Sequence, residues 1–438
     1  MVVWEANCEL KNVRIQWYEK SIINETIEIN TSEILKPSNI DISHHVYKGI
    51  IGPLTSVGNY VYEIVHGQKK QIISSHSFQF FPSIPDGSKL TYPIQIVAFA
   101  DNQFGSFVFD RLVRLASKQH SPNFIIHAGD VVQEFDNLQQ WQTDFYDPLT
   151  SYNLAQHAPI IYAHGNHDFD PNKSNMYTTG AHWYSFTIAN TRWIVLDSNI
   201  DDEKQDLWLS HELSSPETQN ASFKIVVVHI PPFMEFWEPV AWHEKKEKHW
   251  GEFVRTRFVP LFRKYGVDLV ISGHQHNYQR GQSDGTIYTI IGGAGGKLDF
   301  DRVEDWAFYN VVRKTHHYIL MEIWSETIIW KALLKPVANW YTNIAGYRQL
   351  GLRYDDVIAE ESTTVQEALR RVPREEYDQR TLRLRNAFQL SLRNEILPRD
   401  KWIKPVEDIR YLEPYVEQVA FEEAEREAFD AAKVVLKK

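Results

Sequence analysis

Short apolar runs alternate with amphipathic stretches between residues 93 and 345. The runs expected to form buried strands are Ile94–Ala100, Phe124–Ala128, Pro159–Ala163, Trp193–Leu196, Ile225–Val228, Val267–Ile271, Ile287–Ile291, Tyr318–Ile323 and Thr327–Leu334. Between them, apolar residues recur at helical spacing, as in Val108, Leu112 and Leu115 or Val254, Phe258 and Leu261. Buried strands that alternate with helices predict an α/β domain whose sheets lie between helices, a four-layer αββα arrangement.

The first 90 residues show a different pattern. In Asn12–Tyr18, apolar and polar residues alternate with the period of a half-buried strand. Gly58–His66 and Gln71–Phe81 are rich in β-branched and aromatic residues, and Gly52-Pro53 marks a turn. These features predict a small antiparallel, fibronectin-III-like β-sandwich. Phe81–Lys89 is expected to be the linker that leads out of it.

After residue 350 the composition shifts to Arg, Glu, Leu and Ala. Two apolar helix faces are expected, one from Leu384, Ala387, Phe388 and Leu392 and one from Phe421, Ala424, Ala428 and Phe429. The pattern therefore predicts three parts: a β-sandwich over 1–88, an α/β domain over 89–348 and a helical appendage over 349–438. Arginines interspersed with glutamates in the appendage indicate a solvated face, the alternatives being a cap over an active site or a homodimer surface; they are Arg370, Arg371, Arg374, Arg380, Arg383 and Arg385.

Composition and charge narrow the class of protein. The chain of 438 residues is 43% hydrophobic and 24% charged, which is typical of a globular protein with a full core. Its net charge of −11 without a basic block argues against a nucleic-acid partner. No apolar run reaches the ~18 residues of a membrane span, and the start of the chain does not resemble a signal peptide. With Cys8 as the single cysteine, these features lead us to expect a cytoplasmic protein with no membrane partner.

Polar motifs stand where the predicted strands end. They are Asp101-Asn102-Gln103, Gly129-Asp130, Gly165-Asn166-His167-Asp168, Val228-His229 and Gly273-His274-Gln275-His276. The carboxyl ends of strands in open α/β sheets form the ligand crevice, so these side chains can converge despite their wide spacing. Carboxylates and amide oxygens are hard ligands, and imidazoles supply nitrogen for manganese, iron or zinc. Glycines before the ligands let the backbone turn sharply.

No single motif decides the question. A lone Gly-Asp at a strand end is usually a turn, and an isolated buried histidine such as His229 is more often a structural group than a ligand. Two imidazoles around one residue, as in His274 and His276, have little packing rationale. The conjunction of all the motifs, each after its own apolar run, predicts a metal centre.

With these motifs, the sequence resembles the calcineurin-like metallophosphoesterase superfamily and, within it, purple acid phosphatases and their bacterial relatives. The resemblance covers about residues 1–345 and extends to the segments Trp183–Phe186, Ile194–Ser198, His276–Arg280 and Gly292–Gly296. Such relatives carry a β-sandwich before the catalytic domain. The resemblance implies a phosphoric ester hydrolase with two divalent or mixed-valence metal ions.

The resemblance also implies a role for each residue. Asp130 would bridge both ions. Asp101 and His276 would bind the first ion, while the second would be bound by Asn166, His229 and His274. His167 would face the substrate and stabilise the transition state or protonate the leaving alkoxide.

One position departs from the family pattern. The superfamily places a histidine two residues after the first aspartate, where this chain has Gln103. Purple acid phosphatases use a tyrosine three residues after the bridging aspartate, where this chain has Gln133. The amide oxygen of Gln103 is therefore a candidate ligand, the alternative being that water completes the coordination shell. Without a tyrosinate, manganese or ferrous iron is expected, with zinc and magnesium as alternatives.

The expected reaction is hydrolysis of a small phosphate monoester by metal-activated hydroxide, with in-line displacement. The alternatives are a phosphodiesterase acting on a nucleotide or lipid headgroup, and a non-catalytic binding protein on a phosphatase fold. The aromatic segment from Pro231 to Gly251 is expected either to line the substrate pocket or to pack the sandwich against the catalytic domain. In this segment His243 and His249 are the candidate phosphate contacts.

Overall fold

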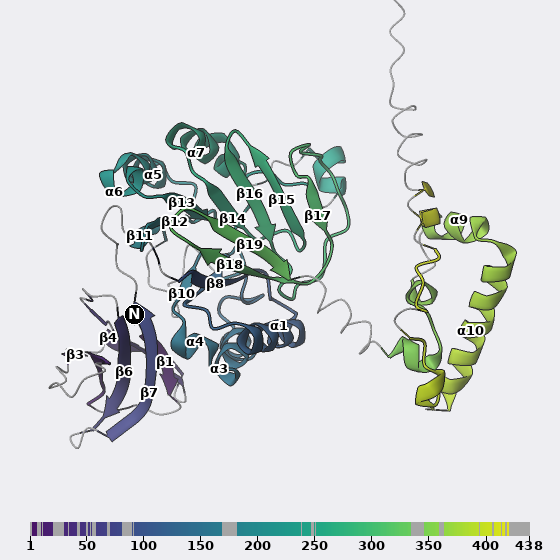
Figure 1. Cartoon of the computed structure of the whole chain (residues 1–438), viewed down its shortest axis with the longest axis horizontal. Coiled ribbons are helices and arrows are strands. Elements are labelled where there is room, and N and C mark those ends of the chain that lie inside the picture. Colours follow the sequence, from purple (N-terminus) through teal and green to yellow (C-terminus); the bar gives the residue numbers. More distant parts are fainter. Residues whose placement is uncertain are drawn as a thin grey trace, which may run out of the picture. The chain divides into compact units, whose positions relative to one another are not determined.

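The computed structural model forms two compact units, residues 1–334 and 335–438 (Figure 1). In the first unit it describes residues 2–6, 10, 12–20, 30–33, 35–41, 44–49, 51–52, 54, 58–67, 71–80, 90, 92–168, 182–237, 239–246, 249 and 251–333. In the second it describes 346–358, 363–393, 395–404, 407–412, 414–416 and 418–419. The sequence prediction places the start of the last part after residue 348, whereas the second unit begins at Lys335.

Two antiparallel sheets form the N-terminal part of the first unit. One has the strand order β1 (Val2–Ala6), β5 (His44–Gly49), β4 (Leu35–Asp41). The other has the order β3 (Asn30–Glu33), β2 (Arg14–Glu19), β6 (Gly58–His66), β7 (Gln71–Phe80). On β2, Ile15 and Trp17 are buried while their neighbours are partly exposed, which confirms the predicted alternation. The predicted linker Phe81–Lys89 lies outside the described residues.

Two larger sheets follow. The first has five strands in the order β10 (Ile160–Tyr162), β9 (Phe124–His127), β8 (Ile94–Phe99), β18 (Tyr318–Ile323), β19 (Ile328–Leu333). The second has seven strands in the order β11 (Tyr184–Ile188), β12 (Thr191–Val195), β13 (Phe223–Val227), β14 (Leu269–Ser272), β16 (Thr286–Ile291), β15 (Tyr278–Ser283), β17 (Val311–Arg313). Strands β8, β9 and β10 are parallel to one another, as are β12, β13, β14 and β16. Parallel strands end at the same edge, so the polar residues that follow them are brought together.

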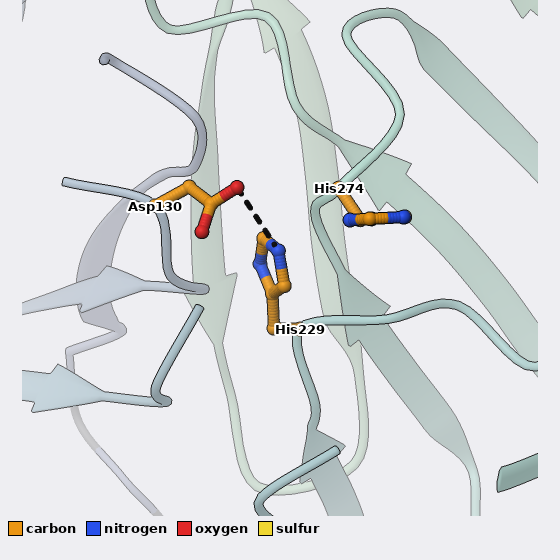
Figure 2. A group of neighbouring side chains, drawn as sticks. All are labelled: Asp130, His229 and His274. Atoms are coloured by element: carbon orange, nitrogen blue, oxygen red, sulfur yellow. Dashed lines mark ion pairs between the residues drawn. The ribbon is translucent and has the colours of Figure 1, made fainter. Parts of the chain in front are cut away.

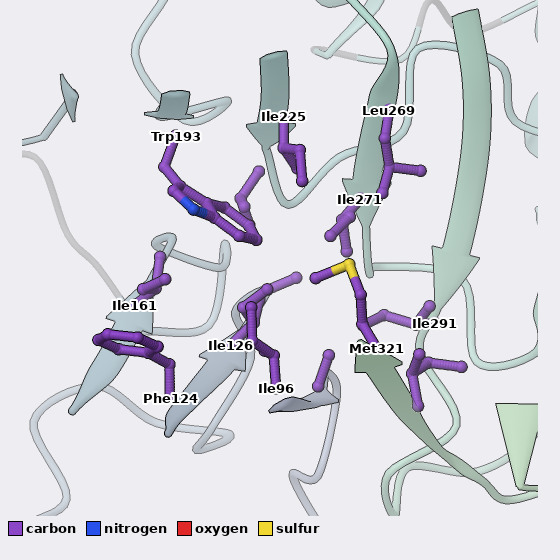
Figure 3. Close-up of a cluster of buried hydrophobic side chains, with 14 of the residues drawn as sticks. Ile96, Phe124, Ile126, Ile161, Trp193, Ile225, Leu269, Ile271, Ile291 and Met321 are labelled. Atoms are coloured by element: carbon purple, nitrogen blue, oxygen red, sulfur yellow. The ribbon is translucent and has the colours of Figure 1, made fainter. Parts of the chain in front are cut away.

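The main hydrophobic core lies between these two sheets (Figure 3). Alternate residues of each strand point into it, such as Ile96 from β8, Ile225 from β13 and Met321 from β18. The residues in between face helices instead, as Val226 and Val228 do. Because both faces of the central strands are buried, these strands are continuous apolar runs rather than alternating ones.

Helices cover the outer faces of both sheets. Beside the seven-stranded sheet lie α5 (Glu203–Ser214), α6 (Pro216–Gln219), η3 (Val254–Phe258) and α7 (Val259–Tyr265) (Figure 1). Side chains of α5, η3 and α7 pack on its outer face. The helical segments after β8 and β9 are α1 (Ser106–Gln119), α2 (Leu138–Gln140), η1 (Trp141–Tyr146), α3 (Asp147–Ser151) and α4 (Leu154–His157). A last short segment, η2 (Val240–Glu244), follows β13. Helices and sheets together form a mixed α/β fold.

The buried face of α1 differs from the prediction. Its buried residues are Phe109, Leu112, Val113 and Ala116, whereas Val108 and Leu115 are only half-buried. Phe109 packs edge-on against Phe99 of β8, with ring centroids 5.3 Å apart. The larger aromatic side chain sets the rotation of the helix, which the apolar spacing alone did not reveal.

The second unit is built from short helices around α10 (Arg374–Leu392). The others are η4 (Tyr347–Leu350), η5 (Tyr354–Val357), α9 (Thr363–Arg371) and η6 (Arg399–Lys401). The predicted apolar face of α10 is wrong in part, because Phe388 is 66% and Leu392 71% exposed while Ala387 is buried. The second predicted face, from Phe421 to Phe429, lies outside the described residues. Among the described helices, none combines the length and apolar character that crossing a membrane requires.

Two arginines of α10 correct the expectation of a solvated charged face. Arg380 is 2% exposed and its Nη1 donates to the carbonyl of Asp356. Arg383 donates two parallel hydrogen bonds to the carboxylate of Asp356, from Nε at 2.7 Å and from Nη2 at 2.9 Å. Such a paired, charge-assisted contact fixes both position and orientation, so these arginines hold the unit together.

Candidate metal centre

The polar motifs converge where the strands of both large sheets end. Asp101 follows β8, Asp130 follows β9 and Asn166 follows β10; His229 follows β13, and His274 and His276 follow β14. Figure 2 shows Asp130, His229 and His274 together, with the carboxylate of Asp130 directed at the imidazole of His229. These three residues offer ligand atoms that lie within 4.8 Å of one another.

Three of the candidate ligand residues have unusual backbone conformations. Asp101, Asp130 and His274 have φ values of 61°, 56° and 67°, the left-handed region that non-glycine residues rarely adopt. This strain turns each side chain from the strand end into the site. Of the glycines expected to supply the turns, Gly129 has a positive φ. Gly165 is needed for a different reason, because a Cβ at this position would collide with the carboxylate of Asp130.

On one side of Asp130 lie Asp101, Gln103 and His276. Nε2 of His276 is 3.6 Å from Oδ1 of Asp101, and Nε2 of Gln103 is 3.1 Å from Oδ2 of Asp130. Nδ1 of His276 lies 2.6 Å from the carbonyl oxygen of Lys297, which leaves its Nε2 directed into the cluster. A histidine held in this way by a carbonyl presents a neutral nitrogen to a metal ion.

On the other side lie Asn166, His229 and His274. Oδ1 of Asn166 is 3.0 Å from Nε2 of His229 and 2.9 Å from Nδ1 of His274. Nδ1 of His229 lies 2.7 Å from the carbonyl oxygen of Ala128, so its Nε2 faces the cluster at 3.3 Å from Oδ2 of Asp130. Oδ2 of Asp130 therefore stands between both groups of side chains.

Asp168 stands in the predicted motif Gly165-Asn166-His167-Asp168, but the sequence prediction gave it no role. Its buried carboxylate accepts hydrogen bonds from the backbone N–H groups of Asp130, Val131, Val132 and Gly165 and from the hydroxyl of Tyr162. These contacts fix the two loops that carry Asp130 and Asn166. Burial raises the pKa of Asp168 to about 6, and the charge of Asp130 adds to this effect. Its place in the motif was the available signal, but a positioning role is visible only in the hydrogen bonds.

His167 lies beside the cluster without joining the two groups. Its backbone N–H donates to Oδ1 of Asp130 at 2.9 Å. Its ring Nδ1 lies 3.1 Å from the carbonyl oxygen of Gln133, the residue at the position of the purple acid phosphatase tyrosine. Gln133 thus contributes a backbone oxygen that orients the half-buried imidazole of His167.

Burial and mutual repulsion shape the charges of the site. Burial raises the pKa of Asp101 well above its usual value, and the charges of Asp130 and Asp299 add to this. Burial also acts to raise the pKa of Asp130, but the charge of His229 and its hydrogen bond outweigh it and hold that pKa below the usual range. Burial acts to lower the pKa of His229, and the carboxylate of Asp130 overcomes this and raises it to about 10.

The donor atoms fit a divalent transition-metal ion. Carboxylates, an amide oxygen and neutral imidazole nitrogens match manganese, iron or zinc. Oε1 of Gln103 is a further indication, because it is buried and has no hydrogen-bond partner. The two ends of an amide exchange by rotation, so this oxygen can take the place of Nε2 beside Asp130 and His276 when a cation occupies the space between them.

The aromatic segment after His229 has a divided role. Trp237 stacks on His274 with ring centroids 5.4 Å apart, and Nε2 of His249 is 3.2 Å from Nε2 of His274. Phe233 instead packs edge-on against the rings of Tyr288, Trp306 and Phe308. His243 is exposed on η2, and it is not among the described contacts of the cluster. Trp250 and the side chain of Trp242 lie outside the described residues.

Comparison with known proteins supports the first part of this picture. Residues 94–278 match the family model described as Calcineurin-like phosphoesterase. Among solved structures, a purple acid phosphatase from yellow lupin (Lupinus luteus) seeds aligns with a TM-score of 0.59 and 16% identity, over 75% of this chain and 69% of that chain. At this identity the likeness shows a shared fold.

The same comparison reveals a second family. Residues 329–427 match the family model described as Ubiquinol-cytochrome C reductase complex 14kD subunit. Cytochrome b-c1 complex subunit 7 of Neurospora crassa is 52% identical over 104 residues, which are 24% of this chain and 84% of that protein. The mitochondrial subunit 7 of Saccharomyces cerevisiae is 44% identical over 102 residues, 23% of this chain and 80% of that protein.

The sequence prediction identified the C-terminal part only as a helical appendage. No motif with recognisable chemistry marks it, and its buried Asp–Arg pairs join residues too far apart to be seen as a pattern. The chain belongs to the calcineurin-like metallophosphoesterase superfamily through residues 94–278 and to the family of cytochrome b-c1 complex subunit 7 through residues 329–427.

Proposed function

We propose that the first unit is a phosphoesterase that binds two divalent metal ions and hydrolyses a small phosphate monoester. The observation that carries this proposal is the position of Asp130 Oδ2, 3.1 Å from the amide of Gln103 and 3.3 Å from Nε2 of His229. A carboxylate shared by two groups of donors is what a pair of neighbouring ions requires. Two such ions supply Lewis acidity that activates water and neutralises the phosphoryl oxygens.

One ion would be held by Asp101, Gln103, Asp130 and His276, and the other by Asp130, Asn166, His229 and His274. Manganese and ferrous iron suit this set of oxygen and nitrogen donors, with zinc and magnesium as alternatives. Asp168 keeps the loops of Asp130 and Asn166 at a fixed separation through its hydrogen bonds.

The remaining residues act on the substrate. We assign to His167 the role of the proton donor to the leaving oxygen. Its Nδ1–H donates to the carbonyl oxygen of Gln133, so the imidazolium form would give the proton on Nε2 to the leaving oxygen and become neutral. Trp237 and His249 pack against His274, and we propose that they contact the substrate and favour a leaving group with a flat or apolar face.

Two measurements test this function. Metal analysis of the purified chain should give about two ions at the cluster; a chain that binds none there would instead be the non-catalytic binding protein. A panel of phosphate monoesters and diesters with added manganese then distinguishes the phosphatase from the phosphodiesterase. Faster turnover of diesters, with metal content unchanged, would overturn the monoester assignment alone.

For the second unit we propose a different role, as a subunit of a cytochrome b-c1 complex. The support is the identity of 52% to the Neurospora crassa subunit 7, together with the coverage of 84% of that protein. The exposed apolar side chains of α10, Leu382, Phe388 and Leu392, offer a surface for neighbouring subunits. The same surface could instead bind a second copy of this chain, the homodimer considered from the sequence. The subunits of a b-c1 complex and a second copy would then compete for it.

This second proposal changes the expected location. The name of the yeast relative places that protein in mitochondria, and we extend this location to the chain in place of the cytoplasm. Fractionation of cells that express the tagged full chain, followed by native electrophoresis of detergent extracts, tests both points. Migration with the b-c1 complex is expected, and Phe388→Asp should release the chain from it. A chain found in the cytoplasm as a dimer would overturn the proposal.

A further inference from the structure

A second group of metal-ligating side chains lies outside the cluster around Asp130. It consists of His164, His182 and Asp197, whose donor atoms all lie within 4.8 Å of one another. His164 follows β10, His182 precedes β11 and Asp197 follows β12. Strands β10 and β11 are the edge strands of the five- and seven-stranded sheets, so the group joins the two sheets at one edge.

The distances within this group suit an ion. Oδ2 of Asp197 is 2.9 Å from Nδ1 of His182 and 3.9 Å from Nδ1 of His164. Ligand atoms about 2.0–2.1 Å from a tetrahedral ion lie roughly 3.4 Å apart, between these two values. Small movements of the two imidazoles would therefore bring all three atoms to ligand distance.

The carboxylate of Asp197 is prepared for this role. Its Oδ1 accepts two hydrogen bonds from Asn199, from the backbone N–H at 2.8 Å and from Nδ2 at 2.9 Å. This leaves Oδ2 directed at the imidazoles. Asp197 is fully buried, and among the described residues no lysine or arginine pairs with it. A buried carboxylate beside two imidazoles has a donor set that zinc and similar ions prefer.

We propose that His164, His182 and Asp197 bind a further divalent transition-metal ion of the zinc class, separate from the ions at Asp130. Three protein ligands leave a fourth position for water. The site is distinct from the proposed phosphoesterase function and can be occupied whether or not the chain hydrolyses esters.

The ion would hold the loop of Asn166 in place. Nδ2 of Asn199, already bonded to Asp197, also lies 3.2 Å from the carbonyl oxygens of His164 and Gly165. The ion would thus tie the end of β12 to the loop that carries Asn166 and brace the edge of the two sheets. We expect a structural rather than a catalytic ion.

Zinc content of the full-length chain tests the proposal. The chain is stripped with a chelator, reloaded with zinc alone, passed through gel filtration and analysed for zinc per chain. His182→Gln should lose about one equivalent relative to the unchanged chain, because a glutamine amide still donates to Asp197 but is a poor zinc ligand. His211→Ala, which removes an exposed histidine of α5, should lose none.

Asp130→Asn separates this site from the proposed catalytic centre. That variant should retain about one equivalent of zinc, which the double variant with His182→Gln loses. Cobalt in place of zinc should give the visible absorption of a four-coordinate site in Asp130→Asn but not in the double variant. Asp197→Asn serves as a second removal if His182→Gln does not fold. Equal zinc content in Asp130→Asn and the double variant would overturn the proposal. The contact between His182 and Asp197 would then be a hydrogen bond only.

Discussion

The two units of this chain bury carboxylates in opposite ways. In the second unit, Asp356 accepts two hydrogen bonds from Arg383, and Oδ2 of Asp408 lies 2.6 Å from Nη2 of Arg348. In the first unit, Asp101 and Asp130 are buried with imidazoles and other carboxylates around them. Among the described residues no lysine or arginine pairs with either of them.

This difference separates a structural charge from a site for a cation. Burying a charge without a partner is strongly unfavourable, so a fold either supplies the partner or leaves the position for an ion. In the second unit the fold supplies arginines and the result is rigidity. In the first unit, left-handed backbone at Asp101, Asp130 and His274 holds carboxylates and imidazoles close together. This arrangement has an unfavourable free energy unless cations bind there.

The largest expected effect comes from removing the shared carboxylate. Asp130→Asn should lose most of the metal at the cluster and lower phosphoesterase activity by about 10³-fold or more, because both ions lose a charged ligand. Metal analysis and turnover on a monoester measure this. The exposed Asp136→Asn is the matched control and should change neither. Full metal occupancy and activity in Asp130→Asn would contradict the comparison of the two units, because the cluster would then not need the charge of Asp130 to hold its ions.

His167 sharpens the distinction between holding ions and acting on the substrate. His167→Ala should lower turnover by roughly 10²–10⁴-fold, the usual contribution of a positioned acid, with unchanged metal content. Substrates with very acidic leaving groups should suffer less, because their leaving oxygen needs no proton. Equal losses on good and poor leaving groups would remove the role of proton donor.

In the second unit, removing a carboxylate should destabilise the fold itself. Asp356→Asn removes a charged partner of the buried Arg380 and of Arg383, which keeps its contact with Glu376. Breaking a buried ion pair typically costs about 3–5 kcal/mol. Hydrogen exchange of peptides from residues 346–412 in the full chain measures the loss. Asp378→Asn, whose side chain is 61% exposed and pairs with Arg374, should change stability by less than about 0.5 kcal/mol. A small effect of Asp356→Asn would mean that the pair does not hold this unit together.

Gln103 tests how far the first cluster depends on a neutral ligand. If its buried amide oxygen coordinates an ion, Gln103→Ala should weaken the affinity for the first ion by about tenfold or more and leave the second ion bound. Manganese titration of activity and of bound metal measures the change. Gln139→Ala, an exposed glutamine on α2, is the control. Indistinguishable affinities would show that water completes the coordination shell.

The smallest effect concerns acid stability of the second unit. Burial acts to raise the pKa of Asp408, but hydrogen bonds from Tyr347, Tyr354 and Arg348 outweigh it and hold the pKa below the ordinary value of 3.8. A lowered folded-state pKa stabilises the fold above the unfolded value, and this contribution disappears as the pH falls through the folded value. The difference in unfolding free energy between the unchanged chain and Asp408→Asn should therefore be largest near neutral pH and shrink below about pH 4. A constant difference would contradict the assignment.

The sequence by itself determined strands β8, β9, β10, β12, β13, β14, β16, β18 and β19 of the two large sheets and the polar residues that follow several of them. Apolar runs such as Tyr318–Ile323 appear as strands with the predicted bounds, because burial on both faces demands continuous apolar residues. Asp101, Asp130, Asn166, His229, His274 and His276 were identifiable because each follows such a run. Gln103 was visible as a departure from a known pattern.

Tertiary structure decided what depends on contacts between distant residues. The hydrogen bonds of Asp168 to the loop of Asp130, the pairing of Asp356 with Arg383 and the meeting of His182 with Asp197 arise from strand order and loop geometry. The rotation of helix α1 was also decided by tertiary contacts, since Phe109 rather than Val108 faces the sheet. Periodicity reports which residues share a face, but only packing against a particular neighbour decides which face is buried and which charges find partners.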